Sequence, residues 1–171
     1  MTDSTRPDVD AKAARVLAPG ERMLCYACRP NGPCRLGIRS VAPDGARRVL
    51  AHVTCPASHE DRPGVAHGGW TPAVIDEVFG YLGPLNGAQT VTGTLSVDVL
   101  RPAPVGRDLH IRAWVDRVEG RRWYVKAEMT LPPAGARLAK ASGIFIERRP
   151  DHFHSHHLWL AAQEQAPGAP D

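Results

Sequence analysis

The stretch that decides the fold is Arg62-Pro-Gly-Val-Ala-His-Gly-Gly-Trp-Thr-Pro-Ala-Val-Ile-Asp-Glu-Val-Phe-Gly-Tyr-Leu82. It joins a glycine-rich turn to a segment in which apolar residues recur at i, i+3, i+4 and i+7, the spacing of one helix face. These residues are Val74, Ile75, Val78, Tyr81, Leu82 and Leu85. Pro72 has no N–H and fits only in a first helical turn. The pattern predicts a helix that begins within a residue or two of Thr71 and ends near Leu85.

A second face of this predicted helix carries small residues and a single acid: Gly69, Ala73, Asp76, Gly80 and Gly83. Glycine inside a helix costs about 1 kcal/mol relative to alanine, so its repetition indicates close approach of another backbone or a slender ligand. A packing face with a solvated acid is the alternative. Adjacent helix residues point about 100° apart, so Glu77 does not share the face of Asp76.

The turn before the helix offers backbone N–H groups at Gly68 and Gly69 that can hold an oxyanion, favoured by the helix dipole. Gly68 and Asp76 are eight residues apart, roughly 12 Å along a helix, whereas a base and an oxyanion donor must each lie about 3 Å from one reacting centre. One chain cannot supply both groups. We therefore expect an obligate homodimer with composite sites around a twofold axis, and the sequence leaves open whether two dimers associate further.

The same residues, with three later segments, resemble a known protein family. His67-Gly68-Gly69, Asp76 nine residues after the histidine, and the segment 91–102 ending in Arg-Pro resemble the hotdog-fold acyl-CoA thioesterases of the PaaI type. Segments 118–125 and 139–146 resemble the last strands of that family, so the resemblance covers about residues 22–148. It implies an α+β hotdog fold, in which one long central helix is wrapped by a five- to six-stranded, mostly antiparallel sheet.

The resemblance also implies roles at the site. The Gly68 amide, helped by Gly69, would polarise the thioester carbonyl, and Asp76 would act on the same carbon as base for water or as nucleophile. Thr92 matches a threonine that orients water in one branch of the family. Some relatives have asparagine where this chain has Asp61, and an ionised acid cannot donate an N–H. No cofactor is implied, and the substrate would be a thioester of coenzyme A or of acyl-carrier protein.

Four other residues are expected around this centre. His67 is expected to fix the turn and to contact substrate rather than to transfer a proton. Trp70, on the first turn, is a candidate for lining the acyl tunnel. Phe79 is a candidate for setting the depth of the acyl pocket. Arg101 is the first choice for holding coenzyme A phosphates because it ends a predicted strand.

Two other functions fit the same fold class. Hotdog enoyl-CoA hydratases and dehydratases use an Asp and a His five residues apart with an Asn between them, whereas Asp61 and His67 are six apart without an Asn. A non-catalytic acyl-CoA-binding protein would keep the pocket and lose the reaction. The sequence leaves both open.

Composition sets the remaining limits. A chain of 171 residues with 43% hydrophobic residues is long enough for one domain. We place this domain at residues 22–150. Residues 1–21 are expected to form a helical or disordered lead, and residues 151–171 a His-rich segment and disordered tail. A net charge of +3 is too small to indicate nucleic acid. Because the sequence has neither a long apolar run nor a signal peptide, we expect a cytoplasmic protein without membrane contact.

Neither of two ligand-rich groups is assigned a metal. The spacing of Cys25, Cys28, Cys34 and Cys55 does not match a zinc ribbon. His152, His154, His156 and His157 lie in a segment with few anchoring residues, which we expect to pack on the domain as a short helix or loop, with disorder from Gln163 onward.

Overall fold

The computed structural model describes residues 34–165 of the chain. The segment 1–21, the Cys25 and Cys28 thiols and the last six residues, 166–171, lie outside the described residues, so the expectations for them stay predictions. Within residues 34–165, no helix has the length and apolarity needed to cross a membrane.

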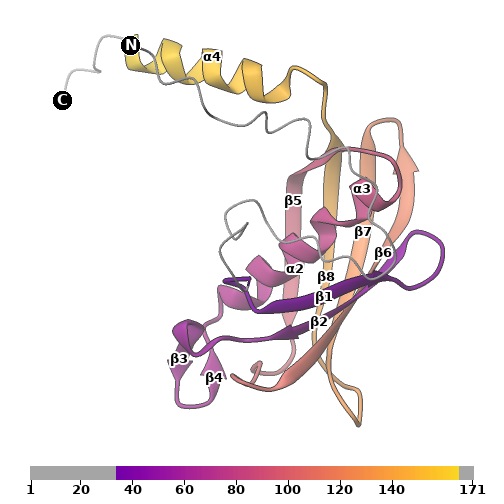
Figure 1. The fold of residues 1–171 in the computed structure, drawn as a ribbon, viewed down its shortest axis with the longest axis vertical. Coiled ribbons are helices and arrows are strands. Elements are labelled where there is room, and N and C mark those ends of the chain that lie inside the picture. Colours follow the sequence, from indigo (N-terminus) through magenta and orange to yellow (C-terminus); the bar gives the residue numbers. More distant parts are fainter. Residues whose placement is uncertain (1–33, 166–171) are drawn as a thin grey trace.

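A six-stranded antiparallel sheet curves around the central helix (Figure 1). Its strand order is β1-β2-β6-β7-β8-β5, and every neighbouring pair is antiparallel. The strands are β1 (Ile38–Pro43), β2 (Arg48–Thr54), β5 (Thr90–Val99), β6 (Asp108–Glu119), β7 (Arg122–Leu131) and β8 (Ala136–Glu147). Buried and less buried residues alternate along β2, β7 and the first half of β6, as expected for strands that place one face on the core. The predicted α+β arrangement is confirmed.

The predicted helix begins where expected but is divided in two. Helix α2 spans Trp70–Gly80 and helix α3 spans Leu82–Leu85. Pro84 explains the division, because it has no N–H to donate to the carbonyl four residues earlier and its ring crowds that carbonyl, which belongs to Gly80. The apolar stripe packs into the sheet: Val74, Ile75, Val78, Tyr81 and Leu82 are buried, and Leu85 is partly buried.

Residues 55–66, which lead into the glycine turn, contain a short 3-10 turn (Ala57–His59) and a two-stranded hairpin, β3 (Glu60–Arg62) and β4 (Val65–Ala66). The three residues of β3 are all exposed and polar, which is why no alternation marked it. The Ala66 N–H donates to the Ala103 carbonyl at 2.9 Å, and the His67 N–H donates to the His59 carbonyl at 2.7 Å. These bonds fix the backbone that enters the glycine turn.

The core lies between α2 and the inner face of the sheet. The largest fully buried side chains include Trp70 and Phe79 from the helix and Leu109, Ile111 and Met129 from the strands. Cys34 and Cys55 are buried free thiols. Burial, together with the nearby charge of Glu60, raises the pKa of Cys55 to about 11, so this thiol stays protonated at neutral pH and is a poor nucleophile.

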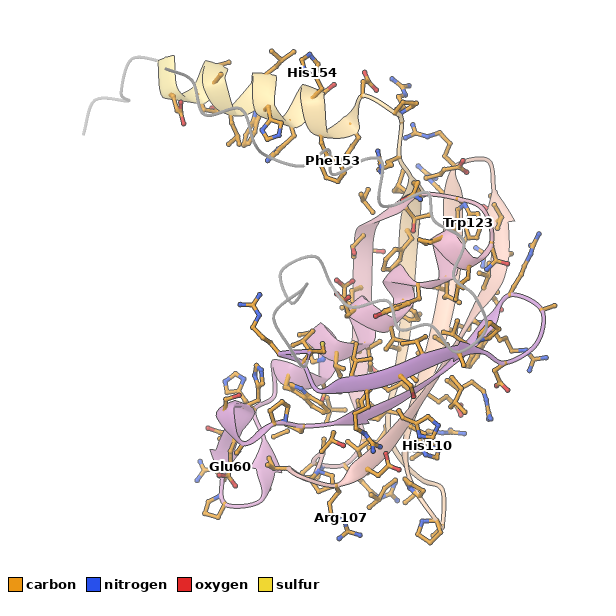
Figure 2. All side chains as sticks on the ribbon, viewed as in Figure 1. Glu60, Arg107, His110, Trp123, Phe153 and His154 are labelled. Atoms are coloured by element: carbon orange, nitrogen blue, oxygen red, sulfur yellow. The ribbon has the colours of Figure 1, made fainter. Side chains whose placement is uncertain are left out.

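The expected packing of the His-rich segment on the domain is wrong. Residues 152–165 form one helix, α4 (His152–Gln165), which extends away from the sheet (Figure 1) and includes Gln163, where we expected disorder to begin. Figure 2 shows Phe153 and His154 on this helix. Four large apolar residues, Phe153, Leu158, Trp159 and Leu160, are exposed. At 100° per residue they fall around the helix rather than on one stripe, so no single face can bury them.

Candidate active site

Asp76 and Thr92 meet between the central helix and the edge strand of the sheet. The Thr92 hydroxyl donates a hydrogen bond of 2.9 Å to Oδ1 of the Asp76 carboxylate. Asp76 is half-buried in the middle of α2, and Thr92 lies on β5 opposite the buried Phe145, on the sheet face that α2 covers. Within residues 34–165, Oδ2 of Asp76 accepts no hydrogen bond. One carboxylate oxygen is therefore held in place while the other is available to a substrate or water.

A bulge in β5 directs Thr92 toward the helix. The register between β5 and β8 shifts between Thr92 and Thr94, so Gly93 has no partner of its own. A Cβ at Gly93 would lie 2.9 Å from the Ile144 carbonyl oxygen, which leaves room only for glycine. Bulges re-aim the neighbouring side chain. Gly93 was missing from the predicted site, although a glycine inside a strand of alternating residues is the signal of a bulge.

The glycine turn is held by the side chain of His67. Its Nδ1 accepts a hydrogen bond of 3.0 Å from the Gly69 N–H, and its carbonyl accepts one of 2.9 Å from the Trp70 N–H. The Gly69 amide, which was expected to assist with the oxyanion, is thus already used within the turn. His67 Nδ1 must be unprotonated to accept this bond, so the proton of a neutral ring is on Nε2.

Gly68 keeps a free backbone donor. Across residues 34–165 its N–H donates no hydrogen bond, and nothing lies within 4 Å of the position that a Cβ would take. Gly68 is exposed, directly before the first turn of α2, so the dipole of the helix favours a negative atom there. The same helix separates it from Asp76 by two turns. The two groups therefore do not meet within one chain.

The small-residue face of the helix is open near Asp76 and filled beyond it. Ala73 is exposed, and a Cβ at Gly80 would meet nothing within 4 Å. At Gly83, by contrast, a Cβ would lie 2.6 Å from the Thr90 hydroxyl and 3.0 Å from the Ala88 carbonyl. Close approach at Gly83 thus comes from the same chain, while the face around Asp76 stays accessible to another molecule.

Two residues predicted to line the acyl site lie in the core of the chain. Trp70 is 1% exposed, and its Nε1 donates a hydrogen bond of 3.1 Å to the Leu36 carbonyl. Phe79 is fully buried and packs edge-to-face on Phe145, with ring centroids 5.7 Å apart. Both side chains contribute to packing between α2 and the sheet.

Arg101 lies away from the Asp76–Thr92 pair, and within residues 34–165 no hydrogen bond joins Asp61 to that pair. The Arg101 guanidinium donates a hydrogen bond of 2.7 Å to the Arg137 carbonyl, and its side chain is exposed. Nine residues of extended chain, about 30 Å at 3.3 Å per residue, separate it from Thr92. Within one chain Arg101 is therefore too far from Thr92 to contact a group bound at Asp76. Asp61 is exposed on the β3–β4 hairpin.

Replacing Trp70 with phenylalanine should lower stability and leave substrate affinity unchanged. The change removes the donor to Leu36 and leaves a partly buried carbonyl unpaired, which costs about 1–3 kcal/mol. Urea unfolding measures the loss. Trp159→Phe is the matched control, because Trp159 is 56% exposed and its replacement should change stability by less than about 0.5 kcal/mol. A raised KM with unchanged stability would instead assign Trp70 to the substrate site.

Comparisons with known proteins agree with this geometry. The family model described as "Thioesterase superfamily" matches residues 63–133, which span the glycine turn, α2 and Thr92. The chain is 28% identical over 89 residues to the acyl-coenzyme A thioesterase THEM4 of Bos taurus. That alignment covers 52% of this chain and 36% of the relative, so the chain spans about a third of the length of the curated relative it matches.

Solved structures share the fold. The PaaI protein of E. coli, from the phenylacetic acid degradation operon, superposes with a TM-score of 0.61 at 21% identity, covering 67% of this chain and 81% of that protein. A hypothetical thioesterase of Streptococcus pneumoniae, solved with coenzyme A, superposes with a TM-score of 0.59 at 18% identity, covering 64% and 84%.

The Streptococcus pneumoniae protein was also solved with an aspartate changed to alanine and, separately, with a threonine sixteen positions further along changed to alanine. Asp76 and Thr92 have the same spacing of sixteen. Residues 63–133 are therefore similar to the thioesterase superfamily, and the order of the secondary-structure elements gives the chain the same fold as the PaaI protein.

Proposed function

We propose that this chain hydrolyses an acyl-CoA thioester to a free acid and coenzyme A. The observation that supports it most is the hydrogen bond from Thr92 to Asp76, which holds a carboxylate in the middle of an accessible helix face. Asp76 takes a proton from water, and the water oxygen attacks the thioester carbonyl carbon. The carbonyl oxygen becomes an oxyanion, stabilised by the Gly68 N–H. Collapse of the tetrahedral intermediate breaks the C–S bond and releases the thiolate, which takes up the proton.

The site needs two chains in this proposal, because Gly68 and Asp76 lie roughly 12 Å apart along one helix. An antiparallel second copy would bring its Gly68 amide to the first copy's Asp76. The exposed Ala73 and the open space at Gly80 leave the helix face free for such a neighbour. Strand β5 also supports a homodimer, because it is ten residues long, mostly exposed and at the edge of the sheet, where an unpaired edge is a template for pairing with another chain.

Coenzyme A is the carrier we favour over acyl-carrier protein. The matched relative is an acyl-coenzyme A thioesterase, and the Streptococcus pneumoniae structure contains coenzyme A. In a twofold assembly, a residue far from Asp76 in one chain, such as Arg101, can reach the site of the partner. Arg101 offers a cation for a phosphate there, at the cost of its bond to the Arg137 carbonyl.

A thiol-release assay with short-chain, long-chain and aromatic acyl-CoAs tests the proposed reaction. Release of free thiol in stoichiometric amounts with the acid supports hydrolysis. Addition of water across the double bond of an enoyl-CoA, with no thiol released, would point to a hydratase. Tight binding of acyl-CoAs without turnover of any of them would point to a binding protein. Either of these last two results would overturn the proposal.

Thr92→Val should lower kcat about 10- to 100-fold while changing KM little. The valine keeps the shape of the side chain but removes the donor to Asp76, and a hydrogen bond to a charged group contributes about 1.5–3 kcal/mol. Steady-state kinetics on the best substrate of the panel measures the effect. Thr92→Ser, which keeps the hydroxyl, is the control and should retain most of the activity. Equal rates for the valine and wild-type proteins would remove Thr92 from the mechanism.

A further inference from the structure

Two histidines and an aspartate meet on neighbouring strands far from Asp76. His52 on β2 pairs directly with His110 on β6, and Asp108 lies two residues before His110 on the same strand. The imidazole rings of the two histidines are 4.4 Å apart at their centroids and inclined by 68°. One potential ligand atom from each of the three side chains lies within 4.8 Å of the other two.

This cluster is on the outer face of the sheet. On β2 the residues that flank His52, Ala51 and Val53, are fully buried, and on β6 the same holds for Leu109 and Ile111 beside His110. Because side chains alternate along a strand, both histidines point away from α2 and the core. Figure 2 shows His110 on the side of the sheet remote from α2. The cluster is therefore separate from the Asp76 site.

The carboxylate of Asp108 is oriented by a second residue. Its Oδ2 lies 3.7 Å from Nε2 of His110, while its Oδ1 accepts a hydrogen bond from the guanidinium of Arg39 on β1. One carboxylate oxygen thus lies near the His110 imidazole, and the other is bonded to Arg39. This is the arrangement of a metal-binding carboxylate with an outer hydrogen-bond partner. The neighbouring cation on β6, Arg112, is paired with Asp44 by a contact of 2.7 Å.

We infer that His52, His110 and Asp108 form a site for a divalent transition-metal ion, with Zn²⁺ as the best fit. Two imidazoles and one carboxylate, with a water molecule as fourth ligand, are a ligand set that zinc accepts in a tetrahedral arrangement. Tetrahedral ligands bound at about 2.0–2.1 Å lie about 3.3 Å apart. Small rotations of the half-buried rings close the remaining distance, since the paired backbones already hold the side chains together. The bound ion would cross-link β2 to β6 through these side chains.

Histidine side-chain NMR on the full-length chain can test this site. Protein labelled with ¹⁵N in its histidines is stripped of metal with EDTA, dialysed and titrated with ZnCl₂, and the ring resonances of His52 and His110 are assigned from the His52→Gln and His110→Gln variants. Individual resonances are needed because α4 and the cysteines can also take up zinc. The matched control is His154→Gln, on the exposed helix α4.

The inference predicts that the resonances of His52 and His110 shift together at the same zinc concentration, and that they still do so in His154→Gln. In His110→Gln the zinc dissociation constant read at His52 should rise at least about tenfold, and Asp108→Asn should also weaken binding. Circular dichroism checks that each variant is folded. Unchanged His52 and His110 resonances after the α4 signals have saturated would overturn the inference. So would an unchanged dissociation constant at His52 in folded His110→Gln.

Discussion

Asp76→Ala is expected to lower kcat/KM for acyl-CoA hydrolysis by roughly 10²- to 10⁴-fold, the contribution typical of a general base. The alanine removes the only group on the open helix face that can take a proton from water, and leaves the Thr92 hydroxyl without its acceptor. Thiol release under steady-state conditions measures the loss. Asp76 is half-buried and is bonded to one side chain, so the folded state should persist.

Two companion variants sharpen this test. Asp76→Asn keeps an oxygen that can accept from Thr92 but removes the base, so it should be as inactive as the alanine variant. Glu77→Gln neutralises the next acid along the helix, which points about 100° away, and should retain activity. The assignment is wrong if a folded Asp76→Ala protein turns over acyl-CoA at the wild-type rate, or if Glu77→Gln is the inactive variant.

Gly68→Pro is expected to lower kcat by roughly 10²- to 10³-fold, as the loss of one oxyanion donor does in other enzymes. Proline removes the one N–H that the turn leaves unbonded. Gly68→Ala is the matched control, because it keeps the N–H and adds a methyl group where nothing lies within 4 Å. The measurement is the ratio of kcat between the two variants, with near-UV circular dichroism to establish that the turn is intact.

Comparing Gly68→Ala with Gly68→Pro separates the loss of the N–H donor from the effect of adding a side chain to the turn. If Gly68→Ala and Gly68→Pro are equally impaired, the turn is sensitive to any side chain and the amide has no demonstrated part. If a folded Gly68→Pro protein is fully active, the oxyanion is held elsewhere. Only a large loss confined to proline supports the donor role of this N–H.

Much of the fold could be predicted because its elements have regular periods. The stripe from Val74 to Leu82 has the period of a helix and is buried as a stripe. The strands alternate on β6 and β7, where one face meets the core. The β1–β2 hairpin follows from the Pro43-Asp44-Gly45 turn, in which Gly45 has a φ of +98°.

The errors arise where local pattern and three-dimensional contacts differ. Pro84 divides the helix through an effect four residues away, and β3 is too short and too polar to alternate. The burial of Trp70 in the core likewise does not follow from its position beside the glycine turn, and its part in substrate binding stays a prediction. The meeting of His52 with His110 depends on the pairing of β2 with β6, which no local pattern encodes.

The sequence predicted the individual residues of the site better than the contacts between them. Residue spacing singled out Asp76 and Gly68, and resemblance added Thr92. The bond between Thr92 and Asp76 requires the β5 bulge at Gly93, whose tight fit against Ile144 appears only once the strands are paired. The use of the Gly69 amide by His67 likewise depends on a ring orientation that the sequence does not specify.

Mixed dimers test most directly the central claim that one chain's Asp76 works with another chain's Gly68. Asp76→Ala and Gly68→Pro chains with different affinity tags are co-expressed, and the dimers that carry both tags are isolated and assayed. The heterodimer has one site in which both residues are intact, so it should recover about half of the wild-type activity, whereas each homodimer stays inactive. A heterodimer as inactive as its parents, with wild-type chains dimeric and active under the same conditions, would contradict the account.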